Sequence, residues 1–394
     1  MNTKAAAAVG VDIAQLITLA VDGLMPMFDA ESELFCYRLQ QEENRLIREG
    51  RSHRYTMISL LGLNQCERTG MATGFDVKKI LQHLVQDTGW INNVGDLGLV
   101  YWLCALAWPD RLAAMSATWD VQNALERFGE VRHQRTTELS WFLAGLAHLS
   151  LVSDSRRAPE VGDVAARVCR LLRENQGDSG MFGHQARTGS VAGFVRGHIG
   201  SFADQVYPVY ALSMFGKAYG VREALDAAGK CAEAICRAQG SLGQWWWHYD
   251  AGTGRVAESY PVYAVHQDGM APMALFALAD EARRDFDEAI YRGLQWIGGQ
   301  NEIGCDLRDS DRKVIWRSVY HGSRYGVWRN RLQYAAGAGM GRESTKQLRL
   351  LRECRPYHFG WLLYAFAGRR SVDPATPAPR PACRAESSNS HLHS

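Results

Sequence analysis

Residues 176–182, Gln-Gly-Asp-Ser-Gly-Met-Phe, are echoed at residues 239–245, Gln-Gly-Ser-Leu-Gly-Gln-Trp, and more weakly at residues 300–306, Gln-Asn-Glu-Ile-Gly-Cys-Asp. The copies share a glutamine followed four residues later by a glycine, and they lie 63 and 61 residues apart. Such a regular spacing indicates a structural repeat. Each copy follows a helical stretch and precedes a turn, and about sixty residues suits two antiparallel helices with their loops. The predicted repeat unit is a helical hairpin.

The rest of the chain fits the same plan, because sustained strand alternation is nearly absent. Six hairpins need about 360 residues, close to the 394-residue chain without its tail. We therefore predict an all-α fold, an (α/α)6 toroid over residues 1–370. Helix-compatible spacings of large apolar residues occupy 97–108, 138–152, 205–219, 221–238, 270–283, 286–298 and 359–367.

The two ends of the chain have their own composition. Near the N-terminus an alanine-rich run faintly imitates a signal peptide, but Asp12 and Asp22 interrupt the apolar residues. We expect an amphipathic opening helix and a cytoplasmic location. Residues 371–394 are rich in proline and serine and cannot bury enough apolar surface to become ordered. This tail is predicted to be disordered.

Composition excludes several classes of protein. With 46% hydrophobic and 22% charged residues the chain is typical of a folded domain. The formal net charge is +2, so no overall field attracts nucleic acid or an anionic membrane, and the apolar runs are too short for a membrane span. The nine cysteines never form Cys-x-x-Cys, so neither a disulfide framework nor structural zinc is expected. No cofactor and no metal site is predicted.

In a toroid the inner helices lie side by side around an axis, and their N-terminal ends open at one end of the ring. Polar residues at the start of otherwise apolar helices are therefore expected to face a common pocket. The candidates are Asp96, Glu138, Asp204, His266, Asp268 and His358. For the aspartates the alternative is a helix N-cap, since Asp accepts hydrogen bonds from free backbone N–H groups there. For the histidines the alternative is a packing role.

The repeat resembles the signature of squalene and terpenoid cyclases and of protein prenyltransferase β subunits. This resemblance implies a toroid fold. The Asp-x-Asp-Asp proton donor of the cyclases and an Asp-Asp-x-x-Asp diphosphate motif are missing from the sequence. The prenyltransferases bind zinc through an Asp-x-Cys pair and a later His. His358, after a tyrosine, looks like that His, but no Asp-x-Cys precedes it.

A second resemblance is to six-hairpin glycosidases, especially unsaturated glucuronyl and rhamnogalacturonyl hydrolases. Residues 95–99, Gly-Asp-Leu-Gly-Leu, resemble their His-Asp-Leu-Gly-Phe segment, and residues 202–207, Phe-Ala-Asp-Gln-Val-Tyr, resemble their Trp-x-Asp-Gly-Leu-Tyr segment. The resemblance implies that Asp96 and Asp204 line a catalytic funnel. These two lie 108 residues apart, so a hairpin ending in Glu138 must stand between them. Where that family has Glu-Ala-Ser, this chain has His-Gln-Asp at 266–268, so sugar epimerisation stays open.

Paired carboxylates suit glycoside chemistry, because one donates a proton to the leaving oxygen while the other accepts a proton from water. Asp204 is expected to be the general acid or base, with Asp96 or Asp268 as its partner and His266 as a further proton-transfer candidate. Aromatic faces stack on sugar rings, and guanidinium groups bind carboxylate or phosphate. The expected substrate-binding residues are Tyr207, Trp246, Trp247, His248, His321, Arg324, His358 and Glu138.

The sequence therefore predicts a carbohydrate-active enzyme that hydrolyses a glycan or performs a related proton transfer. Its expected partner is a small-molecule or oligosaccharide substrate. Two alternatives stay open: a terpenoid-type enzyme on the same ring, and a toroid without chemistry that binds a partner or polysaccharide. Charged, hydrogen-bonding walls favour sugar, whereas walls of nearly pure Phe, Trp and Leu favour an isoprenoid.

Overall fold

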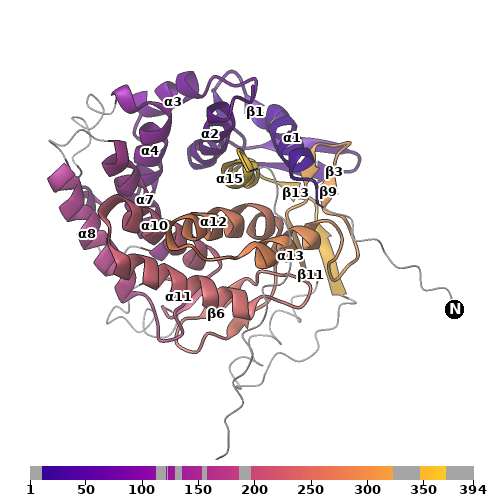
Figure 1. Ribbon diagram of the computed structural model, residues 1–394. Coiled ribbons are helices and arrows are strands. Elements are labelled where there is room, and N and C mark those ends of the chain that lie inside the picture. Colours follow the sequence, from indigo (N-terminus) through magenta and orange to yellow (C-terminus); the bar gives the residue numbers. More distant parts are fainter. Residues whose placement is uncertain are drawn as a thin grey trace, which may run out of the picture.

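The structure is a computed structural model that describes residues 11–111, 121, 123–128, 135–152, 158–185, 197–322 and 347–369. Within them the chain folds into two concentric layers of helices, an (α/α)6 toroid (Figure 1). The inner helices are α2 (His53–Arg68), α4 (Val94–Ala107), α7 (Thr136–Val152), α10 (Ala203–Tyr219), α12 (Ala271–Ala282) and α15 (Pro356–Phe366). The outer helices are α1 (Ile13–Leu24), α3 (Val77–Gln86), α8 (Ala158–Glu174), α11 (Arg222–Ala238) and α13 (Asp287–Ile297).

Short helical turns complete the helical part. They are η1 (Met25–Met27), η2 (Pro109–Arg111), α6 (Ala124–Arg127), which precedes α7, and the π-helical turn η4 (His266–Met270), which leads into α12. The predicted tail at 371–394 lies outside the described residues. In the described part of the chain, no helix has the length and apolar character needed to cross a bilayer.

Burial separates the two layers. Helix α4 is buried almost all the way round, whereas α11 buries a single stripe of small residues and exposes its charged face. A helix that is apolar on every side must lie inside the fold, and an amphipathic one covers it. Each inner helix packs against the next in the order α2, α4, α7, α10, α12 and α15, and α15 returns to α2. The ring is therefore closed by helices from opposite ends of the chain.

Glycines let the inner helices approach closely. A Cβ on Gly98 of α4 would stand 2.4 Å from the backbone nitrogen of Phe142 in α7, and one on Gly145 would stand 2.3 Å from the Gly98 carbonyl. The closing pair behaves in the same way, since a Cβ on Gly62 of α2 would stand 2.3 Å from the carbonyl of Gly360 in α15. No side chain fits at these crossings.

Aromatic side chains from four inner helices fill the axis of the ring. Ring centroids lie 5.1 Å apart for Trp141 and Tyr207, 5.6 Å for Tyr207 and Trp361, 5.6 Å for Trp361 and Trp102, and 4.6 Å for Trp102 and Tyr210. We call these five residues the axial column. Each of them is buried. The centre of the toroid is therefore packed with side chains along this column.

The repeated sequence fixes each hairpin to the next. The Nε2 of Gln176 donates to the carbonyls of Gly180, at 2.7 Å, and of Ala227 in α11, at 2.9 Å. The second copy makes the same two bonds, at 3.0 and 2.9 Å, through Gln239, Gly243 and Ala289. Both glycines have positive φ, 90° and 97°, which favours glycine at this position. In the degraded third copy the bonds are local: Nδ2 of Asn301 donates to the carbonyls of Trp296, in the preceding helix α13, and of Cys305.

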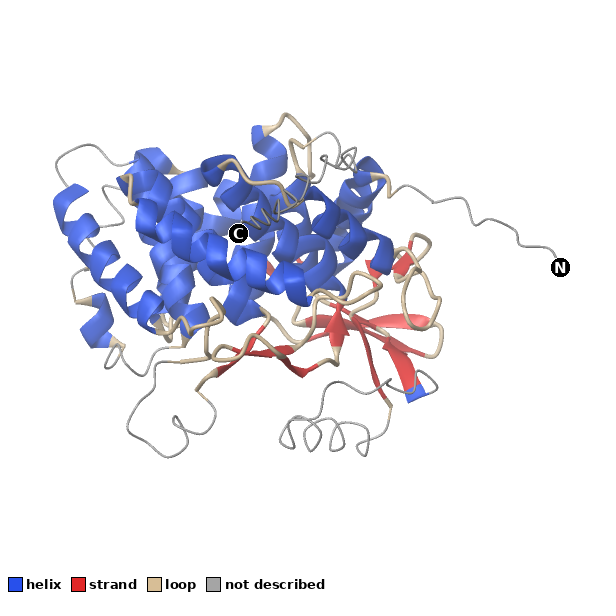
Figure 2. Ribbon diagram, turned by 60° about the horizontal axis from the view of Figure 1, so that its bottom comes forward, coloured by secondary structure: helices blue, strands red, loops and turns tan. Residues whose placement is uncertain are grey.

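Short antiparallel strands lie on one side of the helical layer (Figure 2). Three of them, β5, β8 and β13, run directly into the starts of α10, η4 and α15. None exceeds five residues, which is why the sequence carries so little strand alternation. Their bounds are β1 (Phe28–Asp29), β2 (Leu34–Phe35), β3 (Arg38–Glu42), β4 (Arg45–Glu49), β5 (Ile199–Ser201), β6 (His248–Asp250), β7 (Val256–Glu258), β8 (Val262–Tyr263), β9 (Arg308–Asp309), β10 (Val314–Ile315), β11 (Ser318–His321), β12 (Leu348–Leu351) and β13 (Glu353–Cys354).

Gly98→Ala should destabilise the protein by about 1–3 kcal/mol, because the added methyl has nowhere to go between α4 and α7. Gly162→Ala is the matched control. It lies on the outer helix α8, where the new Cβ would meet its nearest neighbour, the Tyr219 ring, at 3.4 Å. That substitution should be neutral or stabilising by up to about 1 kcal/mol through helix propensity. Urea denaturation of both variants checks the pair, and equal midpoints would contradict the close-packing account.

Candidate active site

The N-terminal ends of the inner helices bring polar side chains to one end of the ring. Since each inner helix packs against its two neighbours, residues at the starts of adjacent helices are neighbours as well. As the sequence required, α7 stands between α4 and α10, so Glu138 lies between the helices of Asp96 and Asp204. The residues at these ends are Arg54 and Tyr55 on α2, Asp96 on α4, Glu138 on α7, Asp204 and Tyr207 on α10, His266 on η4, and Tyr357 and His358 on α15.

Asp204 is fully buried and its carboxylate accepts four hydrogen bonds. Oδ1 accepts from the hydroxyl of Thr137 at 2.9 Å. Oδ2 accepts from the backbone N–H and the hydroxyl of Ser201, each at 2.8 Å, and from Nδ1 of His184 at 3.0 Å. These donors come from three residues and fix the orientation of the Asp204 carboxylate.

His184 is a site residue that the sequence analysis missed. It stands two residues after Phe182, the aromatic position of the first repeat, and its side chain is half-exposed. The hydrogen bond to Asp204 raises the pKa of His184, and the charge of that carboxylate adds to the effect. Trp247 occupies the corresponding place in the second repeat, which the sequence analysis did single out. Comparing the residues that follow the repeat aromatic by two positions could therefore have identified His184.

Asp96 is also buried, and its partner is a guanidinium group. Arg54 Nε lies 2.7 Å from Oδ1, and Oδ2 accepts from the Asn93 side chain at 3.0 Å and from the backbone of Asn92 at 3.3 Å. The Arg54 guanidinium also lies 5.5 Å from the ring centroid of Trp141. Arg54 was not predicted, although it follows the same rule as the others, since it stands at the start of an inner helix after the N-cap Ser52.

Glu138 differs from its two acidic neighbours. Its carboxylate accepts one hydrogen bond among the described residues, a long one of 3.4 Å from the backbone of Arg135. The side chain is half-buried, and α4 approaches it so closely that a Cβ on Gly95 would stand 2.9 Å from the Glu138 Cα. Thr137, the preceding residue, holds Asp204. Glu138 is thus the carboxyl group of this row that is bound least tightly by the protein.

His266 is buried among aromatic rings. Its ring is nearly parallel to Trp247, at 12° with centroids 6.0 Å apart, and contacts Phe202 at 4.6 Å and Tyr263 at 5.1 Å. Burial lowers the pKa of His266 to about 3. The imidazole is therefore neutral at physiological pH, and it stacks in the row of rings that ends at the half-buried Trp247.

Asp268 and His358 bind each other. Nε2 of His358 lies 2.7 Å from Oδ1 and 2.9 Å from Oδ2 of Asp268, and both side chains are almost completely buried. The pair joins η4 to α15. It is a contact between two neighbouring inner helices, so the structure places these two predicted site residues in the wall of the ring.

The remaining predicted binding residues have various surroundings. The Trp246 indole is buried and donates to the Ala238 carbonyl at 2.9 Å. His248 Nδ1 lies 2.6 Å from the Glu258 carboxylate. Tyr207 lies in the axial column, and burial raises its pKa far above the usual value. His321, on β11, contacts the ring of Tyr260 edge-on at 4.9 Å. Arg324 lies outside the described residues.

A basic cluster borders α2 and α15. The buried Glu353 carboxylate accepts from Arg38 at 3.0 Å, from Arg317 at 2.8 Å and also from Arg355. Burial by itself raises the pKa of Glu353, but these guanidinium groups hold the pKa below its usual range. Arg38 is also paired with Glu49 at 2.7 Å, so these three cations meet two anions and leave an excess of one positive charge. Arg317 lies 4.9 Å from the Tyr263 ring.

A cavity of about 550 Å³ lies at the opposite end of the ring and takes residues from each inner helix. Its wall includes His148 and Tyr210, joined by a 2.9 Å hydrogen bond, and Tyr364, whose hydroxyl lies 2.6 Å from that of Tyr210. Burial lowers the pKa of His148 to about 3, so this chain of hydrogen bonds is uncharged.

No group of three potential metal ligands occurs among the described residues.

The fold is that of known glycosidases. No family model and no curated protein matches the chain. Among solved structures, an unsaturated glucuronyl hydrolase specific for heparin superposes with a TM-score of 0.55 and 12% identity, over 91% of this chain and 96% of that one. A possible member of the GH105 family from Klebsiella pneumoniae gives a TM-score of 0.58 and 13% identity, with coverage of 90% and 92%.

An alpha-1,6-mannanase from Salegentibacter has a TM-score of 0.59 and 11% identity, over 92% of this chain and 100% of the other. The chain therefore shares the α/α toroid fold of these structures. The match runs over nine tenths of the sequence and so includes the whole ring. At such low identity it establishes the shared fold, and the side chains of the site must be interpreted from their own chemistry.

The His184–Asp204 pair should make stability depend on pH. Because the folded-state pKa of His184 is raised above 6.5, the stabilisation is complete below pH 6.5 and is lost as the pH rises through the raised value. Asp204→Asn removes the partner while burial still lowers the pKa, so His184 should then titrate at lower pH. NMR titration of the His184 ring, with melting temperatures from pH 5 to 9, tests this. An unchanged midpoint in the variant would contradict the pairing.

Proposed function

We propose that the protein is a glycoside hydrolase that acts on a glycan at the N-terminal end of the ring. The observation that carries the proposal is the row of three carboxyl groups on adjacent inner helices, Asp96, Glu138 and Asp204. Among the described residues the outer two accept short hydrogen bonds from Arg54 and His184, whereas the middle one accepts a single long hydrogen bond of 3.4 Å. Hydrolysis of a glycosidic bond needs two carboxyl groups in opposite protonation states. Enzymes produce opposite protonation states by placing two neighbouring acids in different surroundings, which separates their pKa values.

Each acid has a distinct role in the proposed reaction. Asp204, surrounded by donors, accepts a proton from the attacking water. Glu138 donates a proton to the oxygen of the leaving sugar as the bond between that oxygen and the anomeric carbon breaks. Water supplies the new hydroxyl on that carbon, so one proton enters and one leaves the pair of acids. Asp96 and Arg54 bind substrate hydroxyl groups next to them.

The partners originally expected for Asp204 are assigned other roles. Asp96 is paired with Arg54 at 2.7 Å, so its carboxylate is already bound by a guanidinium group. Asp268 is paired with His358 at 2.7 Å, in a contact that joins two neighbouring inner helices. Glu138 is half-buried and makes one long hydrogen bond among the described residues, so it can exchange its proton with substrate.

The aromatic and basic groups near the row support a sugar ligand. Trp247 is half-buried and stacks on His266, so it offers a flat face of the kind that packs on a sugar ring. The excess positive charge around Glu353 favours a sugar that carries a carboxylate. Two of the similar structures are glycan-degrading enzymes, a heparin-specific unsaturated glucuronyl hydrolase and a mannanase.

The rival functions fit the same residues less well. A terpenoid-type enzyme needs an apolar pocket, whereas ionised groups stand at the starts of α2, α4 and α10. An epimerase of the kind that uses inner-helix histidines needs bases within reach of the sugar, but His266 is covered by Phe202, Trp247 and Tyr263. A binding protein without chemistry gives no reason for a half-buried Glu138 that accepts a single long hydrogen bond among the described residues.

Asp204→Asn and Glu138→Gln should each lower kcat by about 100-fold or more, the usual contribution of a general acid or base. The assay is a screen of neutral and uronic-acid-containing glycans by reducing-sugar release and mass spectrometry. Glu223→Gln, an exposed glutamate in the first turn of the outer helix α11, is the matched control and should keep full activity. Turnover of a prenyl diphosphate instead of any glycan would overturn the proposal.

Trp247→Ala should raise KM for the glycan by about tenfold while kcat falls less, because stacking contributes about 0.5–1.5 kcal/mol to binding. Trp247→Phe keeps a flat face and should restore most of the affinity. Steady-state kinetics of the two variants on the substrate found in the screen separate the effects. A loss confined to kcat, with KM unchanged in both variants, would argue against contact with substrate.

A further inference from the structure

Three tyrosines form a continuous series of ring contacts from the surface of the protein to the starts of the inner helices. Tyr37, between β2 and β3, stacks on Tyr55 of α2, with ring centroids 5.5 Å apart and planes at 13°. Tyr55 in turn contacts Tyr357 of α15 at 4.6 Å. We call these three residues the tyrosine track. Its inner end lies at the end of the ring that carries the row of carboxyl groups.

The tyrosine track continues that row around the ring. Helix α2 packs against α4 on one side and against α15 on the other. Arg54, in the first turn of α2, bonds Asp96 of α4 at 2.7 Å, whereas the next residue, Tyr55, contacts α15. The tyrosine track therefore begins where the row of acids ends, at Asp96.

The outer tyrosine is exposed but held in place. Tyr37 is 41% exposed, while Tyr55 and Tyr357 are half-buried. The guanidinium group of Arg355 lies 4.4 Å from the centroid of the Tyr37 ring and donates to the Tyr55 hydroxyl at 2.9 Å. Arg355 is itself bound to the buried Glu353 carboxylate. A rigid aromatic side chain that is partly in water loses little conformational entropy when a ligand binds to it.

The middle tyrosine also offers a hydrogen-bond donor. Burial raises the pKa of Tyr55 to about 12, so its hydroxyl keeps its proton at physiological pH. That hydroxyl accepts from Arg355, and it donates to no other group in the described part of the chain. A phenolic O–H can donate and accept at the same time. The proton of Tyr55 is therefore available to a ligand hydroxyl.

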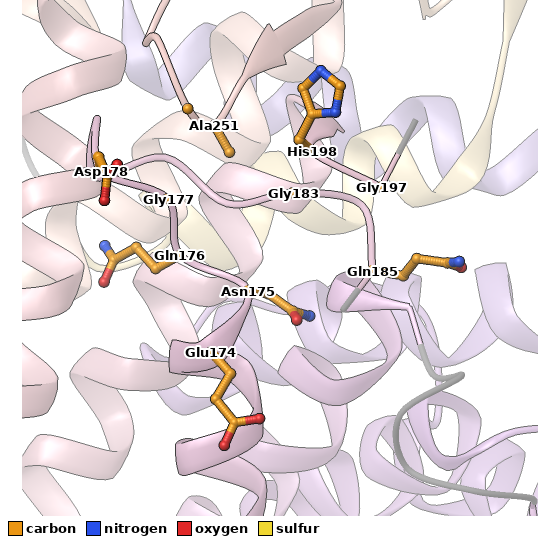
Figure 3. A pocket seen from close by; sticks show the side chains of 11 residues that line it. Glu174, Asn175, Gln176, Gly177, Asp178, Gly183, Gln185, Gly197, His198 and Ala251 are labelled. Atoms are coloured by element: carbon orange, nitrogen blue, oxygen red, sulfur yellow. The ribbon is translucent and has the colours of Figure 1, made fainter. Parts of the chain in front are cut away.

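A single exposed tyrosine is ordinary on a protein surface. The tyrosine track differs, because ring contacts join its exposed end to the proposed site and a guanidinium group fixes that end. The pocket of about 430 Å³ beside the first repeat shows the contrast (Figure 3). Its described lining residues, among them Asn175 and His198, include no tyrosine, tryptophan or phenylalanine. A flat sugar face thus finds a matching surface on the tyrosine track and not in that pocket.

We infer that the tyrosine track binds an outer sugar of a glycan chain whose end lies along the row of carboxyl groups. The apolar C–H face of that sugar ring packs on the exposed part of Tyr37, and the Tyr55 hydroxyl donates to the next sugar towards the acids. The choice of a glycan rests on the proposed function. The inference adds that the protein distinguishes glycans by length, because only a chain that extends past Asp96 reaches Tyr37.

The test is direct binding to the full-length protein labelled with carbon-13 in its tyrosine rings. Disaccharides and tetrasaccharides prepared from mannan, xylan, pectin and heparin are titrated in turn, and a chain that the protein hydrolyses is titrated against Glu138→Gln. The signal of Tyr37, identified by its absence from Tyr37→Phe, reports occupancy. At least one tetrasaccharide should shift this signal in a saturable way. If none does, the inference is overturned.

Variants make the test specific. Tyr37→Ala should weaken binding of that tetrasaccharide by about two- to tenfold, the loss expected for one stacking contact, and leave the matching disaccharide unaffected. Tyr37→Phe keeps the flat face and should bind like the parent protein. Leu242→Ala is the matched control, because Leu242 is 42% exposed on the turn of the second repeat, and its affinity should not change.

Calorimetry measures these affinities. Unchanged tetrasaccharide affinity in a folded Tyr37→Ala, or an equal loss for the disaccharide, would refute the assignment. The titration that follows the Tyr37 signal needs no alanine variant and stays decisive if Tyr37→Ala fails to fold.

The two proposals fail separately. Hydrolysis of a glycan whose tetrasaccharide leaves the Tyr37 signal unchanged would refute the role of the tyrosine track and leave the catalytic proposal standing. Binding of a tetrasaccharide at Tyr37, with no glycan hydrolysed in the screen, would do the reverse.

Discussion

Close contact between inner helices is the constraint on which the rest of the molecule depends. At Gly98, Gly145 and Gly62 the backbones of neighbouring helices lie so near that a single methyl group would collide. This brings the inner ring to a diameter that the axial column of aromatic side chains fills. Because packed interiors tolerate little change in volume, the helix starts are fixed relative to one another. These helix crossings therefore set the spacing between Asp96 on α4, Glu138 on α7 and Asp204 on α10.

Each copy of the repeat combines a structural role with a role in the site. Its glutamine fastens a turn to the next outer helix, and the residues just beyond the repeat aromatic supply chemistry or packing. His184 bonds an acid in the first copy, whereas Trp247 stacks on an imidazole in the second. The same backbone frame thus carries different side chains around the ring, in keeping with the general separation of fold from function.

The sequence predicted the hairpins, the six-fold plan and the intermediate helix at Glu138, because repeat spacing and apolar runs record backbone packing directly. It missed Arg54 and His184. Arg54 opens a helix whose outer turns are mixed in polarity, so 53–68 did not stand out as an inner helix. His184 lies in a connecting segment without a pattern of its own. The pairing of Asp268 with His358 could not be foreseen either, since it joins residues 90 positions apart in the chain.

The axial column also decides how molecules can move through the protein. Among the described residues, the rings from Trp141 to Tyr210 are buried and contact one another across the centre of the toroid. A ligand at the helix starts is therefore separated by these rings from the cavity at the opposite end. If the proposed hydrolysis takes place there, substrate enters and product leaves on the same side, which gives the end of a glycan chain better access than its interior.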